Sequence, residues 1–294
     1  MSAEHSDSFQ LDRAGVRAAF DRASARYEAT AVLQSRVADE LISRLQPFDI
    51  SPQVILDLGA GTGRASAQLK RRYRRSVVVA LDLAPGMLRQ AAHHQRLFRR
   101  FERVCADAAC IPLRPGTIDI VFSNLMLQWC DPLEEVLSEV RRVLKPQGLF
   151  VFTTLGPDTL KELRSAWAEA DAHSHVNRFL DVHDVGDALV RAGLQEPVLD
   201  IDRTQLTYSD GMALMRDLKC IGARNATAGR PRTLLGRNHL QRVLTAYESF
   251  RKDGRLPATY EIVYGAAWGS AGRLAASAHA GEVRISPSDI RRRK

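Results

Sequence analysis

Short apolar segments alternate with longer amphipathic segments along the first half of the chain. Residues 54–56 form an apolar run that ends at an Asp-Leu-Gly sequence, and this run predicts a buried strand. The same pattern predicts further strands at 77–81, 103–104, 118–123 and 149–154, with helices at 64–72, 87–99 and 133–143. Strands and helices that alternate at this spacing indicate an α/β fold with a mostly parallel sheet, right-handed crossovers and helices on both faces.

The second half of the chain alternates less regularly. Helical patterns cover 159–170, 182–192, 211–223 and 238–252, and strand-like alternation covers 197–207 and 259–267. An amphipathic helical stretch at 14–45 precedes the first strand. The pattern therefore predicts one domain over residues 1–268, with a helical cover at 14–45, seven strands, a helical insertion or lid at 208–254 between the last two strands, and a flexible tail at 269–294.

Composition narrows the class of protein. Of the 294 residues, 45% are hydrophobic and 26% are charged, which is ordinary for a globular protein and excludes a disordered chain or a rod. No apolar run approaches the roughly 18 residues that span a membrane, and the polar start carries no secretory pattern. Four irregularly spaced cysteines favour a reducing cytoplasm over a disulfide framework or a zinc ribbon. A net charge of +8 favours acidic partners, such as nucleic acid, an acidic protein or an anionic substrate.

A glycine-rich loop follows the first strand. Residues 57–63 read Asp-Leu-Gly-Ala-Gly-Thr-Gly, so Gly59, Gly61 and Gly63 stand at alternate positions and allow close approach to a ligand. The spacing differs from the dinucleotide pattern, and the carboxylate of Asp57 would repel a phosphate. The loop therefore favours a ligand that carries positive charge, such as an ammonium group, and makes 54–154 the cofactor-binding half.

Two further carboxylates follow the next two strands. Asp82 is placed to accept both hydroxyls of a ribose, and Asp107 is placed to accept from an adenine amino group. Taken singly, either residue could be a helix cap and the loop a tight turn. Together, three carboxylates at successive strand ends describe S-adenosylmethionine better than NAD.

The loop at 57–63 and the segment Leu-Asp-Leu-Ala-Pro-Gly-Met-Leu at 81–88 resemble the class I S-adenosylmethionine-dependent methyltransferases. Within that superfamily, the chain resembles the malonyl-[acyl-carrier protein] O-methyltransferases of biotin synthesis, the BioC family, over about residues 15–268. The matching segments are 20–23 with Tyr27, 122–129, 154–164, 181–189, 218–225 and 256–261. Ala60 departs from many relatives, which carry cysteine there.

The resemblance implies a Rossmann-like fold and a set of site residues. It implies that S-adenosylmethionine contacts Asp57, Gly59, Gly61, Gly63, Asp82, Leu83, Met87, Asp107, Ala108 and Asn124. Tyr27 and Trp129 are the expected substrate-pocket residues, although core packing is an equal alternative for both aromatic side chains.

The acceptor implied by the resemblance is the free carboxylate of malonyl on an acidic acyl-carrier protein, or of malonyl-CoA. Its methyl ester starts pimeloyl and biotin synthesis. A carboxylate is already ionised at neutral pH, so we expect no acid–base residue. An arginine is the expected carboxylate-binding group. Arg224 is preferred over Arg164 and Arg232, against the alternative that each is a surface group.

Other functions stay open at this point. The chain could methylate a free small carboxylic acid, as the similar trans-aconitate enzymes do, or act on a protein, as mitochondrial relatives do in respiratory complex I assembly. The helical insertion and the matches at 155–164 and 256–261 favour a malonyl thioester. We expect no metal, because His173 and His175 near Asp171 lack a third and fourth ligand at zinc spacing.

Two basic runs, 70–75 and 96–103, are candidate contacts for an acidic carrier protein. A solvated helix end is the ordinary alternative for each. RNA is a weaker alternative, because no interleaved stacking aromatics or RNA-binding module accompanies the runs. The sequence leaves the oligomeric state open.

Overall fold

The computed structural model describes residues 11–95, 99–171, 175–223, 226 and 236–270. Seven strands in this part of the chain form one sheet in the order β3-β2-β1-β4-β5-β7-β6, and all neighbours are parallel except β7, which is antiparallel to β5 and β6. Their bounds are β1 (Val54–Leu58), β2 (Val77–Asp82), β3 (Glu102–Cys105), β4 (Ile118–Asn124), β5 (Leu144–Leu155), β6 (Gln195–Tyr208) and β7 (Leu256–Trp268). The predicted mostly parallel, seven-stranded sheet is confirmed.

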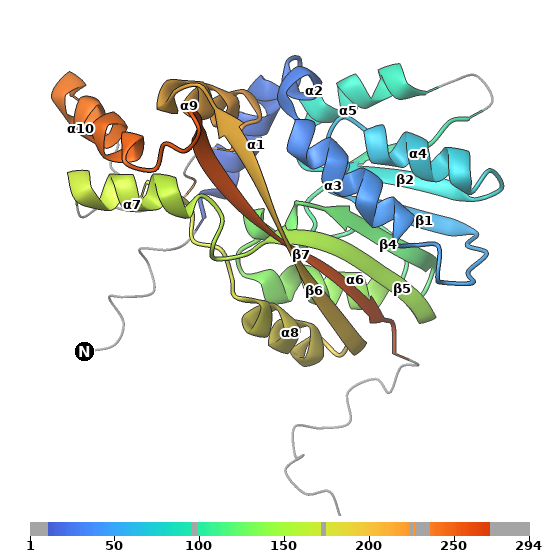
Figure 1. Ribbon diagram of the computed structural model, residues 1–294. Coiled ribbons are helices and arrows are strands. Elements are labelled where there is room, and N and C mark those ends of the chain that lie inside the picture. Colours follow the sequence, from blue (N-terminus) through green and yellow to red (C-terminus); the bar gives the residue numbers. More distant parts are fainter. Residues whose placement is uncertain (1–10, 96–98, 172–174, 224–225, 227–235, 271–294) are drawn as a thin grey trace, which may run out of the picture.

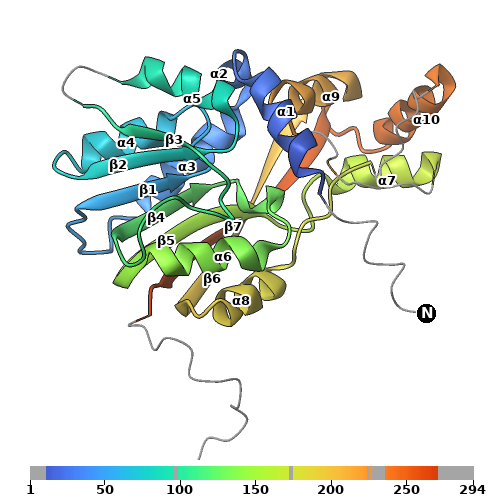
Figure 2. The same cartoon turned by 180° about the vertical axis from the view of Figure 1, so that it is seen from behind.

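Helices cover both faces of the sheet, as predicted (Figures 1 and 2). One face is covered by α3 (Val32–Ser43), α4 (Arg64–Arg72) and α5 (Pro85–Ala91), and the other by α6 (Leu133–Val143) and α8 (Val182–Arg191). Two buried clusters fill the layers between sheet and helices, and neighbouring residues of β1 enter opposite clusters. The period of two along the strand therefore divides its apolar side chains between the two layers.

The stretch 14–45 is divided into three helices, α1 (Arg13–Ala23), α2 (Tyr27–Thr30) and α3. No glycine or proline stands at either break, so the sequence carries no helix-breaking residue that would predict them. The breaks let α1 leave the sheet and pack against α5, where the backbone N–H of Gly86 donates to the Asp21 carboxylate. The segment thus becomes a cover over the ends of the strands (Figure 2).

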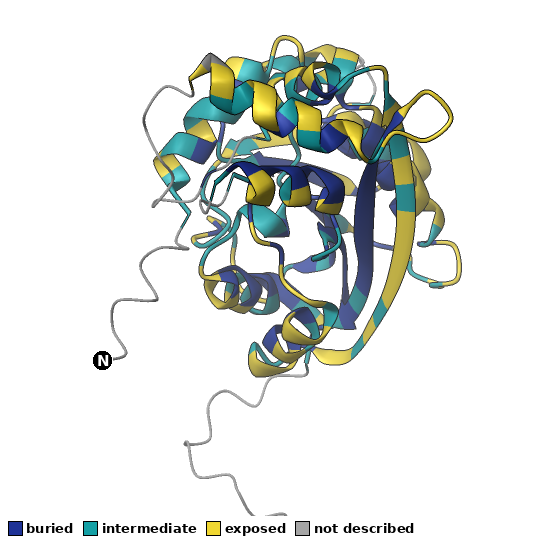
Figure 3. Cartoon of the chain, turned by 60° about the vertical axis from the view of Figure 1, so that its left-hand side comes forward, coloured by how far each residue is buried: buried dark blue, intermediate teal, exposed yellow. Residues whose placement is uncertain are grey.

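The insertion between β6 and β7 carries α9 (Gly211–Cys220) and α10 (Arg237–Glu248), as predicted. It lies beside α1 and α2, and α10 packs on α7 (Lys161–Ala170) (Figure 1). The central strands are buried on both faces, whereas β6 is largely exposed along the edge of the sheet (Figure 3). Helix α8 covers part of β6.

The two basic runs lie away from this cover. The first occupies the end of α4 and the turn into β2, and the second leads into β3, so both lie at the amino ends of the parallel strands. In Figure 1 the strands run from that side toward α1, α2 and α9. Of the second run, residues 96–98 lie outside the described part of the chain. No helix in the described ranges has the length and apolar character needed to cross a membrane.

Candidate functional site

A cavity, here called the first cavity, opens at the carboxyl ends of β1, β2 and β4 beneath α1 and encloses about 890 Å³ of empty space, including its open side. The sequence-predicted residues that line it are Tyr27, Gly59, Gly61, Asp82, Leu83, Met87, Asp107, Ala108, Asn124 and Trp129. Asp57 and Gly63 are not in its wall.

The sequence predicted a helical cover at 14–45 but not which residues of α1 line the first cavity. Arg13, Val16, Arg17 and Phe20 all line it. Val16 and Phe20 are four residues apart and share one helix face. That spacing was a visible signal for a buried face, but it did not indicate what the face covers.

Two glycines of the loop have different roles. Gly61 has a φ of +54°, and a Cβ atom there would meet nothing within 4 Å, so the open space beside it belongs to the first cavity. Gly63 has a φ of +75°, but a Cβ atom there would lie 2.7 Å from Cβ of Ala91 and 3.0 Å from Cζ of Phe101. Gly61 therefore leaves room for a ligand, and Gly63 lets α4 begin against α5.

The two carboxylates at the ends of β1 and β2 also differ. Asp82 accepts hydrogen bonds from the backbone N–H groups of Gly61 and Ala84, both at 2.8 Å, and each oxygen keeps a lone pair for a ligand hydroxyl. Asp57 is only 1% exposed and accepts a bond from the Ser66 hydroxyl at 2.5 Å. Burial is the main cause that raises the pKa of Asp57, to about 7, and that raises the pKa of Asp82 as well. A cation in the first cavity would favour the ionised form of Asp82.

Asp107 and Asn124 are the other predicted polar contacts in the wall of the first cavity. Asp107 Oδ1 accepts from the backbone N–H of Ala109 at 2.9 Å, and its other oxygen lies 3.7 Å from Arg13 of α1. Asn124 lines the cavity, but its amide already donates to the carbonyl of Gln34 and accepts from Thr153. Asn124 thus fixes α3 on the sheet as well as forming part of the wall.

A second cavity adjoins the first, and both are lined by Phe20, Tyr27, Leu125 and Trp129. The ring of Phe20 packs edge-on against Trp129, with centroids 5.3 Å apart. Leu125 follows β4 with a φ of +49°, a conformation that non-glycine residues adopt mainly where the surroundings hold them. The second cavity is mostly apolar, and His175 is the one described histidine in its wall, which contains no described Lys, Arg, Asp or Glu.

Comparison with known proteins decides the family. Residues 56–152 match the family described as "Methyltransferase domain". The chain is 50% identical over 275 residues to the malonyl-[acyl-carrier protein] O-methyltransferase of Methylovorus sp. (strain MP688), covering 92% of this chain and 93% of that protein. It is 52% identical to that of Laribacter hongkongensis, covering 91% and 93%, and 48% identical to that of Halorhodospira halophila, covering 98% of each. This chain belongs to the malonyl-[acyl-carrier protein] O-methyltransferase family.

Solved structures agree on the fold. The YcgJ protein of Bacillus subtilis superposes with a TM-score of 0.56 at 12% identity, covering 79% of this chain and 98% of that one. A SAM-dependent methyltransferase of Thermotoga maritima superposes with a TM-score of 0.52 at 13% identity, covering 87% and 100%. The class I methyltransferase fold expected from the sequence is confirmed.

The three arginines that the family resemblance suggested differ in what the structure describes of them. Arg164 donates to the backbone carbonyls of Pro157 and Thr159, at 2.8 and 2.7 Å, and lines a neighbouring cavity instead of the second one. Arg224 and Arg232 lie outside the described residues, although Arg224 directly follows Ala223, which lines the second cavity. Arg224 therefore stays the preferred carboxylate-binding prediction.

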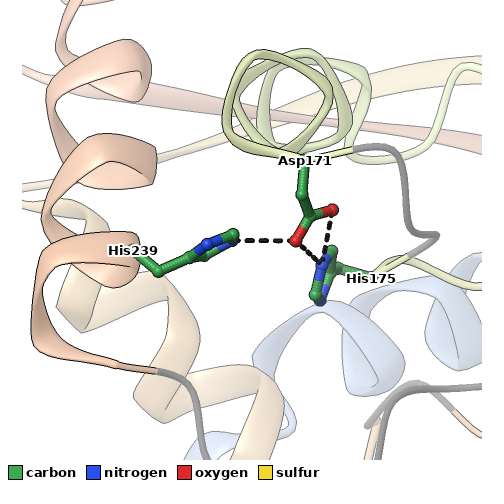
Figure 4. Close-up of side chains that lie close together, drawn as sticks. All are labelled: Asp171, His175 and His239. Atoms are coloured by element: carbon green, nitrogen blue, oxygen red, sulfur yellow. Dashed lines mark hydrogen bonds and ion pairs between the residues drawn. The ribbon is translucent and has the colours of Figure 1, made fainter.

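The structure adds a third group beside Asp171 and His175, the imidazole of His239 from α10 (Figure 4). His173 lies outside the described residues. A metal-bound histidine normally donates its second ring N–H to an acceptor. Here Nδ1 of His239 faces the guanidinium of Arg242, which is a donor, at 3.2 Å. Asp171 instead accepts hydrogen bonds from His175, and the donor beside Nδ1 of His239 does not fit a metal ligand.

Proposed function

We propose that this protein transfers the methyl group of S-adenosylmethionine to the free carboxylate of a malonyl thioester, carried on acyl-carrier protein, and so forms the methyl ester that begins biotin synthesis. The observation that carries the proposal is the pair of adjoining cavities in a chain of this family. The first cavity has the carboxylates for ribose and adenine, and the second is apolar and closed by the N-terminal cover. The two meet at Tyr27 and Trp129.

When bound, S-adenosylmethionine supplies a methyl group on a positively charged sulfur, which an ionised carboxylate attacks directly as the carbon–sulfur bond breaks. The protein has no proton to move, so its task is alignment. Phe20, Leu125 and Trp129 exclude water where the two ligands meet. Because two opposite charges disappear in the products, a water-poor junction favours the reaction.

Tyr27 is the polar group at this junction. Burial, and secondarily the nearby Asp82 carboxylate, raises the pKa of its hydroxyl well above the ordinary value. The hydroxyl therefore stays protonated at neutral pH and is available to donate to the acceptor carboxylate. Tyr27 acts as a hydrogen-bond donor in this scheme and not as a base.

The test compares labelled methyl transfer to malonyl-carrier protein, malonyl-CoA and free malonate. We expect turnover with the two thioesters and little with malonate. Preference for free malonate would instead support the small-acid function, and no turnover with any of the three would reject both. Arg224→Ala should raise KM for the thioesters, and unchanged kinetics would remove Arg224 from the acceptor site.

A further inference from the structure

His175 lines the second cavity, and the proposed methyl transfer does not use it. Its Nε2 lies 2.8 and 3.0 Å from the two carboxylate oxygens of Asp171, which directly follows α7. Its ring also stacks on Trp167, with centroids 3.8 Å apart and planes inclined by 17°. The bond at one edge (Figure 4) and the stacked indole on one face restrict the orientation of the imidazole.

This arrangement determines where the proton of a neutral His175 lies. An ionised carboxylate only accepts hydrogen bonds, so Nε2 must carry the proton, and Nδ1 is then an acceptor. The hydrogen bonds that His175 forms with described residues both use Nε2. Nδ1 is therefore an acceptor on a side chain that lines a mostly apolar cavity. An acceptor there calls for a donor from the ligand.

The position of His175 indicates which part of an acceptor it meets. The carboxylate must reach the junction with the first cavity, and His175 is not among the four side chains at that junction. In a malonyl group carried on a pantetheine arm, the thioester sulfur separates the malonyl from the first amide of the arm. That amide supplies the first N–H group along the acceptor.

We propose that Nδ1 of His175 accepts a hydrogen bond from the first amide N–H of the pantetheine arm. The inference rests on the proposed function and names the feature of the acceptor that the second cavity recognises. Free malonate has no such N–H, so this contact selects carried malonyl groups over free acids. Carrier protein and coenzyme A share the arm, and His175 does not distinguish them.

The experiment uses two small acceptors at pH 8. One is the malonyl thioester of N-acetylcysteamine, and the other is a malonyl alkyl thioester of equal length with methylene in place of N–H. Wild-type protein should show about tenfold higher kcat/KM for the first acceptor, the order expected for one hydrogen bond to a buried group. His175→Phe keeps a ring against Trp167 and should reduce that ratio to about one by lowering only the first value.

Two further variants sharpen the result. His239 lies 2.8 Å from the same Asp171 oxygen, poorly aligned for a hydrogen bond, and lines neither cavity. His239→Gln is therefore the matched control and should keep the wild-type ratio. Asp171→Asn can donate to Nε2 or accept from it, so it removes the requirement for a proton on Nε2 and should lower the preference.

A wild-type ratio near one, or a ratio unchanged in His175→Phe, would overturn the inference. Equal losses with both acceptors would show a packing role only. Malonyl-carrier protein and malonyl-CoA give a second readout, in which His175→Phe should raise KM about tenfold for both and leave kcat within twofold. An unchanged KM for both would also overturn the inference. Absence of wild-type turnover with every malonyl thioester would instead reject the proposed function.

Discussion

Asp57 and Asp82 end neighbouring strands, and burial separates their roles. Asp82 faces the first cavity with lone pairs to spare, whereas Asp57 lies beneath the glycine loop and bonds to Ser66 of α4. A carboxyl group that is removed from water and from basic side chains favours its protonated form. Asp57 therefore connects β1 to α4, and Asp82 is the carboxylate that is placed to receive a ligand.

Asp82→Ala removes acceptors for ribose hydroxyls and should weaken S-adenosylmethionine binding by about 1.5 to 3 kcal/mol, roughly 10- to 150-fold in Kd. Calorimetry measures the change. Asp200→Ala, at an exposed position of β6, is the control. Wild-type affinity in Asp82→Ala would exclude Asp82 from the site.

The raised pKa of Asp57 predicts a pH dependence of stability. The unfolded carboxyl loses its proton near pH 4, while the folded one keeps it up to about pH 7. The free energy of unfolding should therefore fall as pH rises from 4 to 7, because the folded state binds one proton more. Asp57→Asn cannot ionise, so its free energy of unfolding lacks this fall. Measured by urea unfolding, its stability relative to the wild type should therefore rise by several kcal/mol from pH 4 to pH 7. A constant difference between the two proteins would contradict the prediction.

Gly61 and Gly63 provide a matched pair of substitutions. Alanine in the left-handed region costs about 1 to 2 kcal/mol at either position. Gly63→Ala also forces a Cβ atom against Ala91 and should lose a further 1 to 3 kcal/mol or so of unfolding free energy. Gly61→Ala should weaken S-adenosylmethionine binding more than Gly63→Ala does, because its Cβ atom enters the first cavity. Urea unfolding and calorimetry together test the contrast, and identical profiles for the two variants would refute it.

At the scale of elements, α1 closes the first cavity through polar contacts at both of its ends. Near its start, Arg13 donates to the carbonyl of Asp131 at 2.6 Å and to Glu135 at 3.0 Å. Near its end, Asp21 accepts from the backbone N–H of Gly86. Few apolar side chains of α1 are buried, so its position depends on these bonds.

Arg13→Ala should therefore loosen α1 and speed dissociation of S-adenosylmethionine about tenfold, the order expected for lost hydrogen bonds from a charged group. Stopped-flow displacement measures the rate. Arg22→Ala, on the exposed side of the same helix, should dissociate at the wild-type rate. Equal rates in the two variants would show that α1 is held by other contacts.

Across the whole molecule, net charge and the position of the site have separate consequences. The charge of +8 favours an acidic carrier protein, but both basic runs lie at the amino ends of the strands, opposite the two cavities. Lys70 in the first run also donates to the carbonyls of Arg74 and Ser76 and so stabilises its own turn. Long-range attraction does not require these runs to touch the carrier protein.

Salt should accordingly lower kcat/KM for malonyl-carrier protein by several-fold between low and physiological ionic strength, with little effect on a small malonyl thioester. Reversing the charge of Arg99 and Arg100 should change the rate with carrier protein only slightly, because the two residues lie at the opposite edge from the cavities. A large selective loss in that double variant would place carrier docking at the amino edge after all. Equal salt responses of both acceptors would exclude electrostatic steering.

The sequence by itself determined the order of strands and helices, the glycine loop and the carboxylates at the strand ends. These are local signals: a period of two or 3.6, and residue types at a strand terminus, where parallel strands bring their carboxyl ends to one edge. Asp82, Asp107 and Gly61 could be assigned to the first cavity for this reason.

Tertiary structure decided what depends on packing between distant segments. It divided the N-terminal stretch so that α1 covers the first cavity, it made Asp57 a buried partner of Ser66, and it turned Arg164 toward backbone carbonyls. It also brought His239 of α10 beside Asp171, although the two residues are 68 positions apart in the chain. Local sequence patterns do not predict such contacts, because the contacts form only when folded elements pack against one another and exclude water.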